Sequence, residues 1–242
     1  RDQHVMARRQ RQMCRRDRIN LIDDVRNLFK SKLLNEVFTI DKTGQKTIEW
    51  IGGSFLADEP AIFGEPNQDY IDRELTWYKS QVGNVNAIPG KVPAAWKMAA
   101  NDWGEVNSNY GQLVYSDKYH NQYGRVLDEL LVNPDGRRAT MVYNRPSIWE
   151  EYNENGKSDF ICTNAVTYYI RNDKLHSIVQ MRSNDVVFGY KNDYAWQLFL
   201  LEELVRDYNE CKNDNYEEIK TGDIIWQVQN LHVYERHFDL VK

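Results

Sequence analysis

The feature that most constrains the fold of this chain is a pair of strand-like runs joined by a two-residue turn signal. Residues 160–170 are rich in β-branched and aromatic side chains and contain Cys162, and residues 175–181 form a second apolar run. Asn172 and Asp173 lie between the runs, and both residue types favour tight turns. The sequence therefore predicts a β-hairpin in which residues of the two strands face each other.

The rest of the chain mixes helical and strand patterns in an irregular order. Apolar residues at helical spacing predict helices, and apolar runs bounded by turn residues predict strands. The predicted helices are 19–34, 69–82, 94–100, 119–131 and 194–208; the other predicted strands are 37–40, 47–52, 139–143 and 224–233; the predicted loops include 84–93 and 104–111. Without a regular βαβ repeat, this order predicts an α+β fold with a mostly antiparallel or mixed sheet flanked by helices.

Composition predicts one domain preceded by a basic arm. A chain of 242 residues can bury a sizeable core, and residues 19–242 contain no internal repeat or linker. Residues 1–18 are arginine-rich with few large apolar groups, so we expect a flexible arm, with a nucleic-acid or partner contact as the alternative. The net charge of −5 gives the whole chain no field that would draw it to nucleic acid.

The cysteines and the hydropathy pattern indicate the compartment. Cys14, Cys162 and Cys211 are widely spaced and form no Cys-x-x-Cys pattern, so we expect neither a disulfide framework nor a metal site. A reducing cytoplasm is the simplest interpretation. No apolar run approaches the length that spans a bilayer, so we expect no membrane partner.

Cys162 is the first candidate for chemistry. A cysteine in an apolar strand is usually an inert, buried residue. A nearby cation can lower the pKa of a thiol, and Arg182 follows the second strand of the predicted hairpin, where it can face Cys162. The hairpin therefore makes Cys162 a candidate nucleophile.

Two groups of arginines suit a phosphate monoester. Arg137 and Arg138 form one group, and Arg182 with Ser183 forms another. Guanidinium groups match phosphate oxygens in charge and geometry. Lys42 on a predicted turn is a third cation, and surface ion pairing is the alternative for each group taken alone.

These residues belong to a longer series of landmarks that resembles the thymidylate synthase superfamily. Its members share an Arg-Thr-Gly turn, a Glu-Leu-x-Trp helix, a Tyr-Gly pair, Asn-Pro-x-Ser-Arg-Arg, Pro-Cys-His, Gln-Arg-Ser-x-Asp, Gly-x-Pro-Phe-Asn and His-x-Tyr. In the same order this sequence has Lys42-Thr43-Gly44, Glu74-Leu75-Thr76-Trp77, Tyr110-Gly111, Asn133-Pro134-Asp135-Gly136-Arg137-Arg138, Ile161-Cys162-Thr163, Met181-Arg182-Ser183-Asn184-Asp185, Gly189-Tyr190-Lys191-Asn192-Asp193 and His232-Val233-Tyr234. The resemblance covers about residues 37–238.

The departures from that pattern resemble the deoxycytidylate (dCMP) hydroxymethylases of large tailed bacteriophages. Thr163 replaces His, Met181 replaces Gln, and Asp193 replaces the Asn that reads the base. Cytosine offers an amino group and an unprotonated ring nitrogen, so its partner must accept from one and donate to the other. A protonated carboxyl does both, and a carboxylate does so once the ring nitrogen is protonated during the reaction, whereas an amide suits uracil. A helix cap at Asn192 or Asp193 is the structural alternative.

The resemblance implies a role for each landmark. Cys162 is the expected nucleophile, Glu74 the proton relay and Asp193 the base-reading residue. The expected binding residues are Lys42, Arg137, Arg138, Arg182 and Ser183 for phosphate, His232 and Tyr234 for the sugar, Asp185 and Tyr110 as pocket supports, and Trp77 and Trp103 for folate. The resemblance also implies methylenetetrahydrofolate as co-substrate, no metal, and a homodimer in which the arginine pair comes from the neighbouring subunit.

The implied activity is hydroxymethylation of carbon 5 of dCMP in the cytoplasm of an infected bacterium. The first alternative is a methylase of thymidylate synthase type or a hydroxymethylase acting on dUMP, against which Asp193 argues. The alternative from another class is a protein without catalytic activity that binds nucleic acid or other phage nucleotide-synthesis enzymes. An intact Cys162 and Glu74 argue against that alternative.

Overall fold

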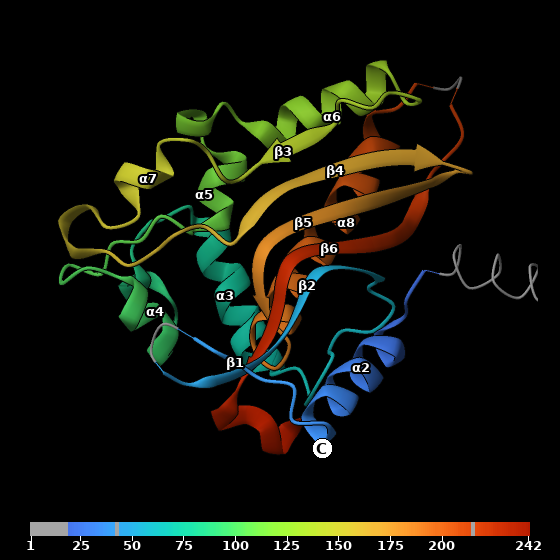
Figure 1. Cartoon of the computed structure of the whole chain (residues 1–242). Helices are drawn as coiled ribbons and strands as arrows, with labels where there is room; N and C mark the ends of the chain where they lie inside the picture. Colours follow the sequence, from blue (N-terminus) through green and yellow to red (C-terminus); the bar gives the residue numbers. More distant parts are fainter. Residues whose placement is uncertain (1–18, 42–43, 214–215) are drawn as a thin grey trace, which may run out of the picture.

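A single mixed sheet organises the computed structural model, which describes residues 19–41, 44–213 and 216–242 (Figure 1). The predicted arm and Lys42 lie outside the described residues. The strands are β1 (Thr39–Ile40), β2 (Lys46–Leu56), β3 (Thr140–Val142), β4 (Thr163–Arg171), β5 (Lys174–Asp185) and β6 (Lys220–Tyr234). Their order across this part of the chain is β1-β2-β6-β5-β4-β3, and only β5 and β6 pair in parallel. The predicted mixed sheet with flanking helices is confirmed.

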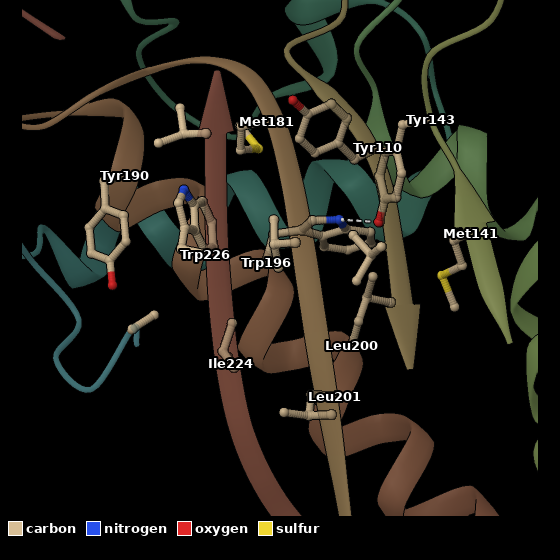
Figure 2. Packing of buried hydrophobic residues seen from close by; sticks show 14 of the residues in the cluster. Tyr110, Met141, Tyr143, Met181, Tyr190, Trp196, Leu200, Leu201, Ile224 and Trp226 are labelled. Atoms are coloured by element: carbon tan, nitrogen blue, oxygen red, sulfur yellow. Dashed lines mark hydrogen bonds between the residues drawn. The ribbon is translucent and has the colours of Figure 1, made fainter. Parts of the chain in front are cut away.

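One long helix covers one face of the sheet. The α-helices are α2 (Ile22–Leu34), α3 (Gln68–Ser80), α4 (Ala94–Ala99), α5 (Tyr110–Tyr115), α6 (Gln122–Val132), α7 (Ile148–Glu151) and α8 (Gly189–Cys211), and the 3-10 helices are Val85–Ala87, Asp117–Tyr119, Glu154–Gly156 and Glu235–Leu240. Helix α8 packs on β5 and β6 and lies behind them in Figure 1. Figure 2 shows the resulting core, where Trp196 of α8 donates a 3.1 Å hydrogen bond to the hydroxyl of Tyr143. No helix among the described residues is both long enough and apolar enough to cross a membrane.

The predicted hairpin is present, with a longer second strand than expected. Asn172 and Asp173 have φ angles of 52° and 56°, which is the left-handed conformation that a two-residue hairpin turn requires. Strand β5 continues to Asp185 because its last residues pair with β6, Ser183 opposite Asn230 and Asp185 opposite His232. The Arg-Ser-Asn-Asp motif is therefore part of strand β5 and does not follow the strand.

Helix α8 begins five residues earlier than the predicted start at Tyr194. One carboxylate oxygen of Asp185 accepts the backbone N–H groups of Val187 (2.9 Å) and Phe188 (2.6 Å), and this fixes the turn that leads into Gly189. Asp193 consequently lies within the helix and does not cap it. The capping alternative for Asp193 is wrong.

Helix α5 lies where a loop was predicted up to residue 111. Asn109 accepts the N–H of Gln112 at 2.8 Å and so caps this short helix. A Cβ at Gly111 would lie 1.8 Å from the carbonyl oxygen of Tyr78, so only glycine permits the close approach of α5 to α3. The sequence pattern missed α5 because six residues give too little periodicity.

No helix of the described residues covers the second face of the sheet. In β5 and β6 the side chains of Val179 and Trp226 are buried on the α8 side. Gln180 and Gln227 are the next residues along the two strands, so their side chains are on the other face. There they line a shallow hollow together with residues 52–54 of β2. No labelled helix crosses in front of β4, β5 and β6 in Figure 1.

Candidate active site

Cys162 and Arg182 are in contact, as the hairpin predicted. Cys162 immediately precedes β4, and its carbonyl accepts the N–H of Arg182 at 2.8 Å. The guanidinium of Arg182 donates to the carbonyls of Ile161 (2.9 Å) and Phe160 (2.5 Å), and its Nη2 lies 3.5 Å from Sγ of Cys162. A register shift at Asn164 follows directly, and such β-bulges redirect side chains beside functional sites. The arginine is therefore held beside the sulfur, where its positive charge lowers the pKa of the thiol.

The thiol of Cys162 is nevertheless protonated at neutral pH. Burial raises its pKa to about 11, against the lowering by Arg182, and the carboxyl groups of Asp193 and Asp159 raise it further. Arg182 lowers the pKa of the thiol, as predicted, but this effect is smaller than that of burial. Desolvation outweighs one cation because charge is costly in a buried site.

Asp193 is a half-buried carboxyl group that keeps its proton at neutral pH. Burial and the nearby Glu74 raise its pKa to about 8, and a hydrogen bond from Asn184 partly opposes this. Nδ2 of Asn184 donates to Oδ2 of Asp193 at 2.7 Å. The carboxyl group therefore offers one donor and one acceptor at pH 7.

Glu74 lies in a network of aromatic side chains. Its Oε1 accepts hydrogen bonds from the hydroxyl of Tyr70, one turn earlier in α3, and from Nε1 of Trp96 in α4 at 2.8 Å. Nε1 of Trp96 also lies 2.9 Å from the hydroxyl of Tyr70. Glu74 is only 5% exposed, and this burial raises its pKa although both hydrogen bonds lower it. A carboxyl group with a raised pKa is suited to accept and donate a proton.

Several predicted binding residues gather at one end of the β5–β6 pair. Ser183, Asp185 and His232 are adjacent in the parallel register, and the His232 ring lies 5.0 Å from that of Tyr234. Burial lowers the pKa of His232, although Asp185 opposes this, so the imidazole is neutral at pH 7. Oδ2 of Asp185 is buried and has no hydrogen-bond partner within the described structure.

Tyr110 also belongs to this region. It is buried at the start of α5, and its ring stacks on that of Tyr78 at 5.4 Å. Its phenol interacts with Thr163, the residue after Cys162, and with the carboxyl group of Asp193. These contacts suit a pocket support.

The structure does not bring Arg137 and Arg138 to this site. Both are exposed on the segment between α6 and β3, where the next residue, Ala139, accepts the N–H of Tyr168 at 2.8 Å. Cys162 lies beyond the other end of β4, about 17 Å away at the rise of a strand. Arg138 is paired with Glu129 at 3.1 Å.

The two predicted folate-facing tryptophans have different environments. Trp77 is 0% exposed, and its Nε1 donates to the carbonyls of Val82 (2.8 Å) and Asn84 (3.0 Å). It is a core residue, and the prediction that it contacts folate is wrong. Trp103 is 66% exposed on the loop between α4 and α5, so it stays a candidate.

Three residues of the site were missed from the sequence. Tyr70 precedes Glu74 by four residues, and this helical spacing is a signal that could have identified it. Trp96 carries no spacing signal toward Glu74. Asn184 lies inside the recognised Arg-Ser-Asn-Asp motif, but its contact with Asp193 depends on the unpredicted extension of β5 and α8. No group of three or more His, Cys, Asp or Glu side chains suited to a metal occurs among the described residues.

Comparison with known proteins agrees with this geometry. The thymidylate synthase family model matches residues 66–242. The chain belongs to the thymidylate synthase family. The deoxycytidylate 5-hydroxymethyltransferase of Enterobacteria phage T4 is 51% identical to this chain, and the match covers 91% of this chain and 89% of the phage protein. A protein with the same name from phage T6 is equally similar. The thymidylate synthase of Fusobacterium nucleatum is 27% identical over 69% of this chain and 57% of its own length.

Proposed function

We propose that this chain is a deoxycytidylate 5-hydroxymethyltransferase. The single observation that carries the proposal is the protonated carboxyl group of Asp193 near the thiol of Cys162, because it can supply the donor and the acceptor that cytosine needs. The hydroxyl of the Asp193 carboxyl group donates to the ring nitrogen N3 of cytosine, and the other carboxyl oxygen accepts from the 4-amino group of cytosine. The similarity to the phage hydroxymethyltransferases supports the same substrate.

The reaction proceeds through a covalent adduct. The thiol of Cys162 loses its proton to water with the help of the positive charge of Arg182, its sulfur adds to carbon 6 of dCMP, and Asp193 donates its own proton to N3. Carbon 5 then attacks the methylene carbon of methylenetetrahydrofolate. Loss of the carbon 5 proton and departure of tetrahydrofolate leave an exocyclic methylene. Water adds its oxygen to that methylene, the bond from sulfur to carbon 6 breaks, and 5-hydroxymethyl-dCMP is released.

The remaining residues bind and position the substrates. Glu74, with Tyr70 and Trp96, moves the protons at carbon 5 and at the attacking water. Arg182 and Ser183 bind phosphate, as does Lys42 outside the described residues, and His232 with Tyr234 binds the sugar. For folate, the unpartnered Oδ2 of Asp185 suits an N–H donor, and Phe188 beside it is 51% exposed, which suits a flat ring. Trp103 is a further aromatic candidate.

The active unit is a homodimer with shared sites. The separation of Arg137 and Arg138 from Cys162 supports this, since a second copy of the chain can supply the pair in trans. The uncovered sheet face around Gln180 and Gln227 is a suitable interface. Residues 19–242 form the single catalytic domain, and the basic arm of residues 1–18 is available to other phage nucleotide-synthesis enzymes in the host cytoplasm.

Release of tritium from carbon 5 tests the function. With methylenetetrahydrofolate, we expect release from labelled dCMP, at least about a hundredfold less from dUMP, and none in Cys162→Ser. Folded Cys162→Ser protein is the control for intact binding. Release from dUMP alone would favour a methylase or a dUMP hydroxymethylase, and release from neither would contradict catalysis on a pyrimidine nucleotide.

A further inference from the structure

A protonated carboxyl group does not by itself distinguish cytosine from uracil. Cytosine needs a donor opposite N3 and an acceptor opposite its 4-amino group, whereas uracil needs an acceptor opposite N3–H and a donor opposite its 4-oxygen. Either oxygen of an isolated carboxyl group can carry the proton. Asp193 could therefore match both bases simply by holding its proton on one oxygen or on the other.

The contact with Asn184 removes this ambiguity. Nδ2 of Asn184 donates to Oδ2 of Asp193 at 2.7 Å, and Asn184 is only 4% exposed. A carbonyl oxygen accepts such a bond better than the oxygen of an O–H group does. The proton is therefore directed to Oδ1, and Oδ2 stays the accepting oxygen.

The surroundings leave the Asn184 amide no competing role. Its Oδ1 is buried without a hydrogen-bond partner in the described structure. A Cβ at Gly189 would lie 3.2 Å from Nδ2 of Asn184 and 3.9 Å from Oδ2 of Asp193, so the glycine keeps the two side chains uncrowded. The amide thus has one polar contact, and that contact is with the base-reading group.

We propose that Asn184 is a specificity-determining positioning residue that fixes the proton of Asp193 on Oδ1 and so makes the site read cytosine and reject uracil. This inference rests on the proposed function. In the bound state Oδ1 donates to N3, and Oδ2 accepts from both the 4-amino group and Asn184. The uracil pattern would require an O–H group on Oδ2, against the N–H of Asn184.

The same contact fixes the direction of a pH effect. The titratable group that acts on Asp193 is Glu74 of α3. The carboxyl group of Asp193 in turn raises the pKa values of the groups that face it, which are Cys162 before β4, Tyr78, Tyr110 and Tyr143. Glu74 raises the pKa of Asp193, and Asn184 lowers it by stabilising the carboxylate. Removing the amide donor raises this pKa, so loss of the protonated form moves to higher pH.

Binding of dCMP and dUMP to the wild type and to Asn184→Leu, measured by calorimetry between pH 6 and 9, tests the proposal. Leucine is close to asparagine in shape and has no donor. We expect the ratio of dUMP affinity to dCMP affinity to rise about tenfold, equivalent to about 1.4 kcal/mol. We also expect the fall in dCMP affinity above about pH 8 in the wild type to move upward.

The matched control is Asn209→Leu. In the wild type, Nδ2 of Asn209 donates to the carbonyl of Ile219 at 2.8 Å near the far end of α8. This variant should leave the affinity ratio unchanged. An unchanged ratio in folded Asn184→Leu, or a pH shift downward, would overturn the inference while the proposed function stands. If the leucine variant does not fold, Asn184→Ala decides by the same readout. A wild type that prefers dUMP would contradict both the proposed function and the inference.

Discussion

At the scale of single residues, the competition between burial and charge decides the state of the site. Arg182 is in contact with the Cys162 sulfur, yet the pKa of the thiol is raised to about 11. The carboxyl group of Asp193 is likewise kept neutral by burial. Both groups therefore hold protons in the free enzyme, and the charged forms arise only when substrate is bound and charge develops in the reaction.

The state of Cys162 predicts its alkylation behaviour. Because only the thiolate reacts, the rate of iodoacetamide modification at Cys162 in the free protein should rise about tenfold per pH unit from pH 7 to 10. Peptide mass spectrometry distinguishes modification of Cys162 from modification of Cys211, which is exposed. Modification of Cys211 shows that the reagent is active. A rate at Cys162 that becomes constant below pH 9 would contradict the dominance of burial.

Local patterns predicted the contact between Cys162 and Arg182 but not the contact between Asn184 and Asp193. Cys162 and Arg182 face each other because a hairpin turn at Asn172 and Asp173 fixes their register. Asn184 of β5 contacts Asp193 of α8, and Trp96 of α4 contacts Glu74 of α3. No periodicity encodes such contacts between separate elements. The error over Trp77 has the same origin, since an aromatic residue on an amphipathic helix is equally suited to the core and to a ligand.

At the scale of elements, the boundaries that differ from prediction are set by tertiary contacts. Strand β5 extends to Asp185 by pairing with β6, and the side chain of Asp185 then starts α8. The central helices and strands were predictable because their apolar patterns are long. Helix α5 was not, because its position depends on one close approach at Gly111.

Replacement of Gly111 tests that approach. A Cβ there would collide with the Tyr78 backbone, so Gly111→Ala should lower the free energy of unfolding by about 3 kcal/mol or more. Gly83→Ala is the control, because its Cβ would meet no atom closer than 3.5 Å, and we expect a change within about 1 kcal/mol. Chemical denaturation measures both, and equal stability of the two variants would contradict the packing of α5 on α3.

At the scale of the whole molecule, the uncovered sheet face and the distant arginine pair both point to a second subunit. If the sites are shared, mixing Cys162→Ser with the Arg137→Ala/Arg138→Ala double variant should restore activity. Each mixed dimer then has one site with an intact cysteine and an intact arginine pair. Half the dimers are mixed, so we expect on the order of a quarter of the wild-type rate after subunit exchange.

A mixture of Cys162→Ser with Glu74→Ala is the matched control for this experiment. Both residues belong to the same subunit's site, so every mixed dimer has two defective sites and no activity returns. Restoration in the control mixture, or its absence in the arginine mixture despite confirmed exchange, would contradict sharing of the site across the dimer.

The most decisive measurement is the mass of the product that forms from dCMP and methylenetetrahydrofolate in water enriched in oxygen-18. Mass spectrometry should show 5-hydroxymethyl-dCMP with the heavy oxygen in its new hydroxyl group, and no dihydrofolate absorbance should appear, because water and not hydride completes the reaction. A methylated product accompanied by dihydrofolate, or turnover of dUMP in place of dCMP, would contradict the assignment of this chain as a deoxycytidylate hydroxymethyltransferase.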